Sequence, residues 1–184
     1  MRAGLNFEKI IEAAASIADH DGLDNVTLTA VAKVLNVRKP SLYNHVDGLA
    51  ELRKGLTIFS IRELKSKISS AAIGKAKEDA ILAIAEAYRT FAHERPGLYR
   101  ATVLISGRSD EEVRQEIHSL MQVMEVVLAA YALNDEDRIH ALRGLRSVMH
   151  GFVALEAAGW FTQDLAKEKS YHQLIDTFIR GLEA

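Results

Sequence analysis

Apolar residues recur at steps of three and four along nearly the whole chain, the spacing that places them on one face of an α-helix. In the first such stretch, this face would carry Phe7, Ile10, Ile11, Ala14, Ile17 and Ala18. No stretch alternates apolar and polar residues as a half-buried strand does. The pattern predicts an all-α fold with helices at about residues 7–21, 28–35, 39–45, 48–70, 76–94, 97–105, 110–132, 135–160 and 170–182.

The breaks between these helices divide the chain into three parts. The capping residues Asn6 and Thr27 precede the first two helices, and Gly22 follows the first one. A stretch rich in Ser, Gly and Lys near 70–76 marks a seam. We therefore predict an N-terminal three-helix unit at 1–48, a connecting helix at 49–70 and a larger helical bundle at 71–184.

Composition is consistent with a globular helical protein and narrows its chemistry. The 184 residues are 48% hydrophobic and 26% charged, with only two prolines. There is no cysteine, which excludes disulfides, thiolate metal sites and cysteine nucleophiles. The first residues lack the apolar core of a secretory signal, and no uncharged apolar run reaches the ~20 residues that a membrane span needs. We expect a cytoplasmic protein without a membrane segment.

A segment in the N-terminal part has the spacing of a helix-turn-helix. Ala32 is small enough for a second helix to cross it, and Asn36, four residues later, tolerates the left-handed backbone of a tight turn. Val37 would anchor the turn, and Leu42 would point inward from the second helix. Pro40 would open that second helix, because proline is tolerated in a first helical turn.

With Leu42 pointing inward, the other sides of this short helix are polar. At 100° per residue they would show Lys39, Pro40, Ser41, Tyr43, Asn44 and His45. Such side chains can bond phosphates or read base edges. The charged residues from Lys33 to Val46 are all basic, although the net charge of the whole chain is -2. A solvated turn is the alternative interpretation of so short a basic run.

The stretch "TLTAVAKVLNVRKPSLYNHVDGLAEL" resembles the DNA-binding signature of the tetracycline-repressor-like (TetR) family of bacterial transcriptional regulators. The resemblance extends from residue 6 to about 56 and rests on Thr27, Ala32, Asn36, Val37, Leu42, Tyr43 and His45. It implies double-stranded operator DNA as a partner of a helix-turn-helix domain at 1–48. The residues that it assigns to DNA binding are Thr27, Thr29, Arg38, Lys39, Pro40, Ser41, Tyr43, Asn44 and His45.

Three positions depart from the family pattern. Asn36 replaces the usual turn glycine, and Arg38 stands where many members have serine. Leu49 stands where many members carry a phosphate-binding lysine. We expect that phosphate contact to be missing unless Arg53 or Lys54 replaces it.

The stretch "VMHGFVALEAAGWF" resembles the WHG-type C-terminal domain of some TetR-like regulators. That resemblance implies a helical bundle that binds a small-molecule effector and forms a homodimer. Polar and aromatic residues at inward positions are candidates for the ligand pocket, with ordinary core packing as the alternative: Tyr88, Tyr99, His118, Met121, Met124, Met149, His150, Phe152 and Trp160. Small residues at seven-residue spacing are candidates for the dimer interface, with close packing inside the chain as the alternative: Gly144, Gly151 and Ala158.

The sequence lacks the motifs of common enzyme classes, including His-Glu-x-x-His, Gly-x-Ser-x-Gly and a glycine-rich phosphate loop. Glu136, Asp137 and His140 lie within one turn, but a solvated helix start explains them better than a metal site. We expect no enzyme activity, metal or cofactor. The sequence predicts a ligand-responsive repressor that binds a pseudo-palindromic operator as a homodimer. A ligand-independent architectural protein and a helical protein-interaction module are the alternatives.

Overall fold

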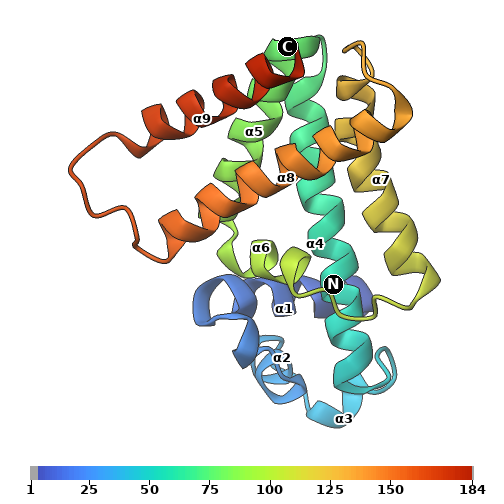
Figure 1. Ribbon diagram of the computed structural model, residues 1–184. Helices are drawn as coiled ribbons and strands as arrows, with labels where there is room; N and C mark the ends of the chain where they lie inside the picture. The colour runs from blue at the N-terminus through green and yellow to red at the C-terminus, as the bar shows by residue number, and fades with distance from the viewer. Residues whose placement is uncertain (1–3, 184) are drawn as a thin grey trace. The chain divides into compact units, whose positions relative to one another are not determined.

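The structure is a computed structural model that describes residues 4–183 (Figure 1). These residues form α-helices, one short 3-10 helix and no β-strand, so the predicted all-α class is confirmed. In chain order the elements are α1 (Phe7–Asp21), η1 (Leu23–Asn25), α2 (Leu28–Val34), α3 (Lys39–Leu42), α4 (Gly48–Ala72), α5 (Lys77–Glu94), α6 (Pro96–Val103), α7 (Glu111–Leu128), α8 (Asp135–Ala157) and α9 (Lys167–Leu182).

Side-chain caps begin the first two α-helices where the sequence predicts them. The side chain of Asn6 accepts a hydrogen bond from the backbone N–H of Lys9 at 3.0 Å. The hydroxyl oxygen of Thr27 accepts one from the N–H of Ala30 at 3.1 Å. These bonds satisfy N–H groups that have no partner inside the helix. Gly22, with a φ of 93°, ends α1 in a conformation that favours glycine.

Helices α3, α7 and α8 each end at least three residues before the periodicity predicts. Helix α3 ends at Leu42, because the N–H of Tyr43 bonds three residues back to the carbonyl of Pro40 and the chain continues as a turn. Helix α7 ends at Leu128 in a turn that leads to the buried Tyr131. Helix α8 ends at Ala157, two residues before Gly159, whose φ of 74° is left-handed. The spacing of apolar residues continues past each of these ends, although the helical backbone conformation stops there.

The described chain divides into two compact units. The first unit consists of residues 4–64 and 92–118, and the second of residues 65–91 and 119–183. Helices α4, α5 and α7 each contribute residues to both units. The functional parts expected from the sequence stay a prediction, because compactness alone does not assign a function.

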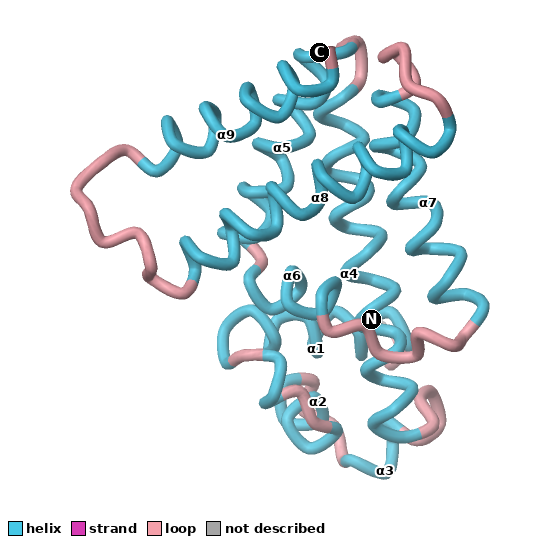
Figure 2. The backbone as a smooth tube through the Cα atoms, in the orientation of Figure 1, coloured by secondary structure: helices cyan, strands magenta, loops and turns pink. Residues whose placement is uncertain are grey.

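The first unit packs α1 against α2, η1 and α6. Figure 2 shows the short connections that join α1, α2 and α3. Its core includes the fully buried side chains of Ile10, Val31, Leu42, Leu52 and Leu98. Burying one such side chain stabilises a fold by about 1.5–3 kcal/mol. The helix-turn-helix therefore rests on an apolar layer that comes from helices distant in sequence.

The second unit contains α8 and α9, together with parts of α4, α5 and α7. Tyr171 is 1% exposed, and its hydroxyl donates to the carbonyl oxygen of Ala85 at 2.9 Å. The ring of Phe152 lies 4.9 Å from that of Tyr171 and 4.7 Å from that of Phe161, measured between centroids. This aromatic cluster joins α8, α9 and the link between them, which Figure 2 shows as an irregular stretch.

Candidate nucleic-acid interface

A left-handed residue forms the turn between α2 and α3. Asn36 has a φ of 52°, and its N–H donates to the carbonyl of Lys33 at 3.2 Å. The N–H of Val37 donates to the carbonyl of Ala32 at 3.0 Å. Asparagine is one of the residues besides glycine that adopt this conformation most readily. The predicted turn at Asn36 is thus confirmed.

Two buried side chains fix the orientation of α3 within the first unit. Leu42 is 0% exposed and Val46 is 2% exposed. The N–H groups of His45 and Val46 both donate to the carbonyl of Leu42, at 2.9 and 3.0 Å. The polar residues around Leu42 therefore face away from the core, because side chains on opposite sides of a helical turn point in opposite directions.

The nine residues predicted to bind DNA lie on the outside of the first unit. Eight of them are exposed and Ser41 is half-buried. Tyr43 is 52% exposed although it is large and aromatic. The nine residues come from the start of α2 and from the segment 38–45. Their contacts with DNA stay a prediction.

The charged side chains on this surface are basic and have no partner within the described residues. Arg38 and Lys39 are exposed, and the side chain of neither forms an ion pair or hydrogen bond with another residue of the described range 4–183. Thr27 uses its hydroxyl oxygen as an acceptor for the N–H of Ala30, which leaves its O–H able to donate. Positive side chains and hydroxyl donors are the groups that proteins use to bind phosphates.

The family's phosphate-binding lysine is absent at Leu49, which is half-buried on α4. Of the two replacements considered, Lys54 is already engaged, because its Nζ lies 3.2 Å from Oδ2 of Asp110. The hydrogen bond from Lys54 lowers the pKa of the Asp110 carboxyl. Arg53 is exposed, and no described residue pairs with it.

A buried aspartate ties α6 to α1 within the first unit. Oδ1 of Asp19 accepts hydrogen bonds from the N–H groups of Gly97 and Leu98, at 2.9 and 3.1 Å. Its Oδ2 lies 2.5 Å from Nε of Arg95, and the Asp19 side chain is 9% exposed. A Cβ at Gly97 would lie 2.1 Å from the carbonyl carbon and oxygen of Ala18. The sequence pattern marks Gly97 only as a helix break and gives no sign of this contact.

The nine residues predicted to line an effector pocket are distributed over both units. Tyr99 and His118 belong to the first unit and the other seven to the second. Four of those seven are core residues: Tyr88, Met124, Met149 and Phe152. Met121 and His150 are half-buried, and Trp160 is 72% exposed. The alternative of core packing accounts for the buried members. Trp160 lies outside the core of its unit.

Among the residues predicted to line the pocket, His150 has a pKa that is shifted from its ordinary value. Burial lowers the pKa of His150, and the positive charge of Arg146 acts in the same direction. His150 is therefore neutral at pH 7, because the ordinary pKa of histidine is already below 7. A neutral imidazole has one hydrogen-bond donor and one acceptor.

The second unit holds a buried ion pair that the sequence pattern does not reveal. Nε and Nη2 of Arg89 donate to the two carboxylate oxygens of Glu156, at 3.0 and 2.7 Å. The two side chains are 12% and 9% exposed. The hydrogen bond with Glu156 raises the pKa of Arg89. Glu156 stands in the stretch that carries the C-terminal resemblance, but nothing in the sequence pairs it with a residue on α5.

The three residues predicted at a dimer interface differ in their surroundings. A Cβ at Gly144 would lie 2.9 Å from the ring of Phe178, so packing of α8 against α9 of the same chain accounts for this glycine. A Cβ at Gly151 would meet no atom within 4 Å apart from its own helix backbone and chain neighbours, and Ala158 is exposed. The predicted interface therefore depends on Gly151 and Ala158.

Two other kinds of site are absent from the described residues. Among residues 4–183, no group of three or more histidine and carboxylate side chains is placed to hold a metal ion. No helix in the same range is long and apolar enough to cross a lipid bilayer.

The fold and the exposed α3 surface define a helix-turn-helix transcriptional regulator with a second, helical unit. The family described as "Tetracyclin repressor-like, C-terminal domain" matches residues 81–178, which is more than half of the chain. The protein belongs to the tetracycline-repressor-like (TetR) family, and the predicted family is confirmed.

Two relatives are similar over nearly the whole chain. YobS of Bacillus subtilis, an uncharacterized HTH-type transcriptional regulator, is 37% identical over 182 residues, which cover 98% of this chain and 94% of YobS. Rv0681 of Mycobacterium tuberculosis, also an uncharacterized HTH-type transcriptional regulator, is 34% identical over 182 residues, 98% of this chain and 83% of Rv0681. The chain is accordingly a DNA-binding regulator of transcription.

Solved structures share the fold at lower identity. A protein of unknown function from Rhodococcus sp. RHA1 has a TM-score of 0.86 and 19% identity, covering 100% of this chain and 98% of its own. BioQ with its natural double-stranded DNA operator has a TM-score of 0.72 and 20% identity, covering 98% and 99%. ActR of Streptomyces coelicolor in complex with (S)-DNPA has a TM-score of 0.69 and 16% identity, covering 98% of each chain.

Proposed function

We propose that the protein is a cytoplasmic, ligand-responsive repressor that binds a pseudo-palindromic operator as a homodimer. One observation carries the DNA-binding part of the proposal. Leu42 is fully buried while the polar residues around it, Lys39, Tyr43 and Asn44 among them, are exposed. In this role residues 1–48 bind DNA, 49–70 connect, and 71–184 bind the effector and dimerise. No catalytic step is part of the proposal.

The assignment of individual contacts follows the chemistry of each side chain. Thr27, Tyr43 and His45 would bind phosphates, which sets the position of α3 on the duplex. Lys39, Ser41 and Asn44 would face base edges in the major groove, where each base pair presents a distinct pattern of donors and acceptors. The operator-bound structure of BioQ, which shares the fold, supports DNA as the partner.

The effector would bind in the second unit. ActR, whose fold is shared, is in complex with a small molecule, which supports this part of the proposal. Ligand sites are mostly apolar with a few polar groups that orient the ligand. In this unit Met124 and Met149 are buried and apolar, and the imidazole of half-buried His150 would be such a polar group. By thermodynamic linkage, an effector that weakens operator binding is itself bound more weakly, by the same factor, in the presence of the operator.

The homodimer would form through the exposed stripe of α8. Gly151, Leu155 and Ala158 lie within about 60° of one another at 100° per residue. Leu155 is 46% exposed, and the space beside Gly151 is open. An exposed apolar side chain next to small residues favours close approach of another helix. Gly151→Leu and Leu155→Arg should therefore shift the protein toward monomer in sedimentation velocity, whereas Gly181→Leu, at an exposed glycine of α9, should not.

The proposal is tested by selecting DNA that binds the protein from a pool of random duplexes and footprinting the selected site. We expect two protected half-sites with centres about 34–36 Å apart and two chains per duplex. Lys39→Glu should abolish this footprint, and Lys169→Glu on α9 should preserve it.

Other results would favour the alternatives. A single half-site bound by one chain would contradict the homodimer. Binding to every duplex alike would indicate an architectural protein. No DNA binding at all, with an intact fold, would indicate a protein-interaction module.

A further inference from the structure

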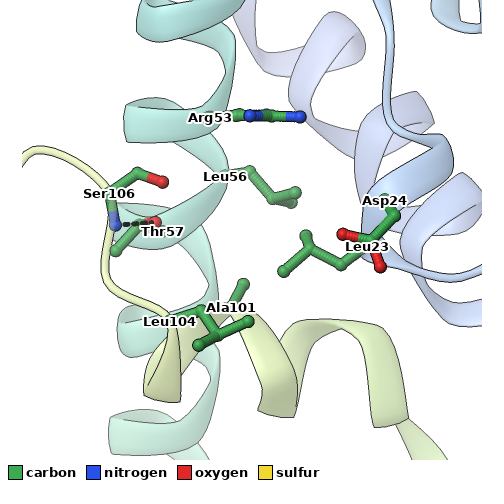
Figure 3. A pocket seen from close by; sticks show the side chains of 8 residues that line it. All are labelled: Leu23, Asp24, Arg53, Leu56, Thr57, Ala101, Leu104 and Ser106. Atoms are coloured by element: carbon green, nitrogen blue, oxygen red, sulfur yellow. Dashed lines mark hydrogen bonds between the residues drawn. The ribbon is translucent and has the colours of Figure 1, made fainter.

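A small hollow in the first unit is lined by none of the nine residues proposed to bind DNA (Figure 3). Its volume is about 140 Å³. It is lined by residues of η1, α4, α6 and the loop that follows α6: Leu23, Asp24, Arg53, Leu56, Thr57, Ala101, Leu104 and Ser106. All of them belong to the first unit. The function proposed above does not involve this hollow.

Apolar side chains form the walls of the hollow. Leu56 is 0% exposed and Ala101 is 2% exposed, so both belong to the core and form a fixed surface. Leu104 is 52% exposed, which is unusual for a leucine that has core residues beside it. A dry cavity of about 150 Å³ in another protein holds one benzene molecule. The hollow therefore has room for a single ring or a short aliphatic chain.

An unpaired positive charge stands at the open side. Figure 3 shows the Arg53 side chain extending across the edge of the hollow, with Leu23 and Asp24 on the facing element. The guanidinium of Arg53 has no ion pair or hydrogen bond within the described residues. Asp24 is engaged elsewhere, because its Oδ2 lies 3.0 Å from Nη1 of Arg100. The available charge at the hollow is thus positive, and a guanidinium binds a carboxylate through two parallel hydrogen bonds.

A buried hydroxyl supplies a second donor. Thr57 is 1% exposed, and its Oγ1 accepts a hydrogen bond from the N–H of Ser106 at 3.3 Å. Its own O–H proton has no acceptor among the described residues. A buried hydroxyl with an unused proton is stabilised when a ligand oxygen accepts from it.

We propose that this hollow binds a small monocarboxylate of about the size of benzoate. The ring lies against Leu56 and Ala101, and the carboxylate accepts hydrogen bonds from Arg53 and Thr57. Such a ligand contacts η1, α4 and α6 at the same time. It therefore stabilises the first unit against unfolding.

The probe is sodium benzoate, titrated into the full chain and followed by two-dimensional amide NMR. We expect saturable shifts at residues of η1, the Arg53 segment of α4 and the end of α6, with a Kd on the order of 1 mM for so small a ligand. Benzamide, which has the same shape without the charge, should bind at least about tenfold more weakly. The melting temperature should rise by about 3 °C at tenfold excess of benzoate over Kd.

Two variants test the assigned contacts. Arg53→Gln should weaken benzoate binding at least about tenfold while leaving benzamide binding unchanged. Arg143→Gln, at an exposed arginine of the second unit, should bind benzoate as the unaltered protein does. Thr57→Val, which keeps the shape, should weaken binding by a smaller factor.

Three results would overturn the proposal. They are the absence of saturable shifts at about ten times the expected Kd, benzoate affinity unchanged in Arg53→Gln, or equal binding of benzoate and benzamide. Since operator binding is measured separately, none of these results bears on the regulator function.

Discussion

The first unit exposes unpaired positive charges, whereas the second buries an arginine together with its carboxylate partner. Arg38 and Lys39 are exposed and unpaired within the described residues. Arg89 and Glu156 are 12% and 9% exposed and joined by two hydrogen bonds. An exposed cation keeps its hydration until a phosphate replaces it, but a buried cation depends on one partner.

Both units expose some apolar side chains, Val34 and Leu104 of the first at 56% and 52% among them, but the short helix α3 differs from the link that follows α8. The second unit exposes Leu155, Trp160 and Leu165, at 46%, 72% and 74%. At the DNA-binding end of the first unit, the apolar residue of α3, Leu42, is fully buried. This difference indicates that the α3 surface suits a polar, charged partner, whereas the end of α8 and the link after it present apolar surface.

The largest expected effect comes from breaking the buried pair of the second unit. Glu156→Ala leaves the Arg89 guanidinium buried without its carboxylate, so the free energy of unfolding should fall by about 3–5 kcal/mol in urea denaturation. Glu112→Ala removes a partner of Arg62 from a pair whose side chains are both 53% exposed. This control variant should lower the free energy of unfolding by no more than about 1 kcal/mol. Equal losses for the two variants would contradict the difference in burial.

A second variant of the pair refines this result. Replacing both partners at once, as Arg89→Met with Glu156→Leu, removes both charges and leaves apolar side chains in their place. The double variant should be more stable than Glu156→Ala. If the double variant is the less stable of the two, the attraction between Arg89 and Glu156 exceeds the free-energy cost of removing both charges from water.

The next effect tests the close contact between α1 and α6 in the first unit. Gly97→Ala places a Cβ 2.1 Å from backbone atoms of Ala18, so the helices must separate. We expect a loss of about 3 kcal/mol in the free energy of unfolding, at the upper end of the usual range for overpacking. Gly181→Ala is the matched control, because no atom lies within 4 Å of its added Cβ.

The control should change stability in the opposite direction. Alanine favours helix over glycine by about 1 kcal/mol, so Gly181→Ala should leave stability unchanged or raise it. If Gly97→Ala is equally well tolerated, α6 is not held closely against α1.

A smaller effect concerns the exposed side chains of the DNA-binding end. Asn44→Ala should weaken binding to the selected operator by about 1–3 kcal/mol if Asn44 bonds a base edge through both amide atoms. Tyr43→Phe removes only a hydroxyl proposed to bind phosphate, so it should weaken binding to operator and random DNA alike. Fluorescence anisotropy with both duplexes at one salt concentration measures the two cases. A uniform loss for Asn44→Ala would move it to the phosphate-binding residues.

The helix-turn-helix could be predicted because its determinants lie close together in sequence. Ala32, Asn36, Val37 and Leu42 fix the turn and the inward side of α3 by local spacing alone. The starts of α1 and α2 were likewise indicated by a capping residue only three positions from its partner. The length of α3 could not be predicted, because the spacing of apolar residues does not show where a short helix ends in a turn.

The features that the sequence did not reveal depend on contacts between distant segments. Glu156 pairs with a residue on α5, and Asp19 bonds the first turn of α6. Gly144 was predicted to lie in a dimer interface, although Phe178 of the same chain packs on it. Apolar spacing predicts an inward position for Trp160. The side chain is exposed because the residue follows the end of α8 and falls in the link to α9. Spacing along one helix cannot distinguish a neighbour in the same chain from one in a second chain.

The smallest expected effect is a pH dependence in the second unit. Burial and the charge of Arg146 lower the pKa of His150 in the folded state below its ordinary value of 6.5. The unfolded chain therefore binds more protons than the folded chain as the pH falls through about 6.5. The free energy of unfolding should decrease as the pH falls from about 7, and this contribution should level off below the folded-state pKa.

Urea denaturation of His150→Asn from pH 7.5 downward tests whether His150 causes this pH dependence. The variant should lose part of the decrease just below about pH 6.5, because asparagine does not titrate there. His118→Asn, at an exposed histidine, should keep the full decrease. If His150→Asn keeps it as well, the imidazole is hydrated in both states and its environment is no different from that of the exposed surface. If the decrease is lost, the second unit buries a histidine that gains a proton more readily on unfolding, whereas His45 of the first unit is exposed.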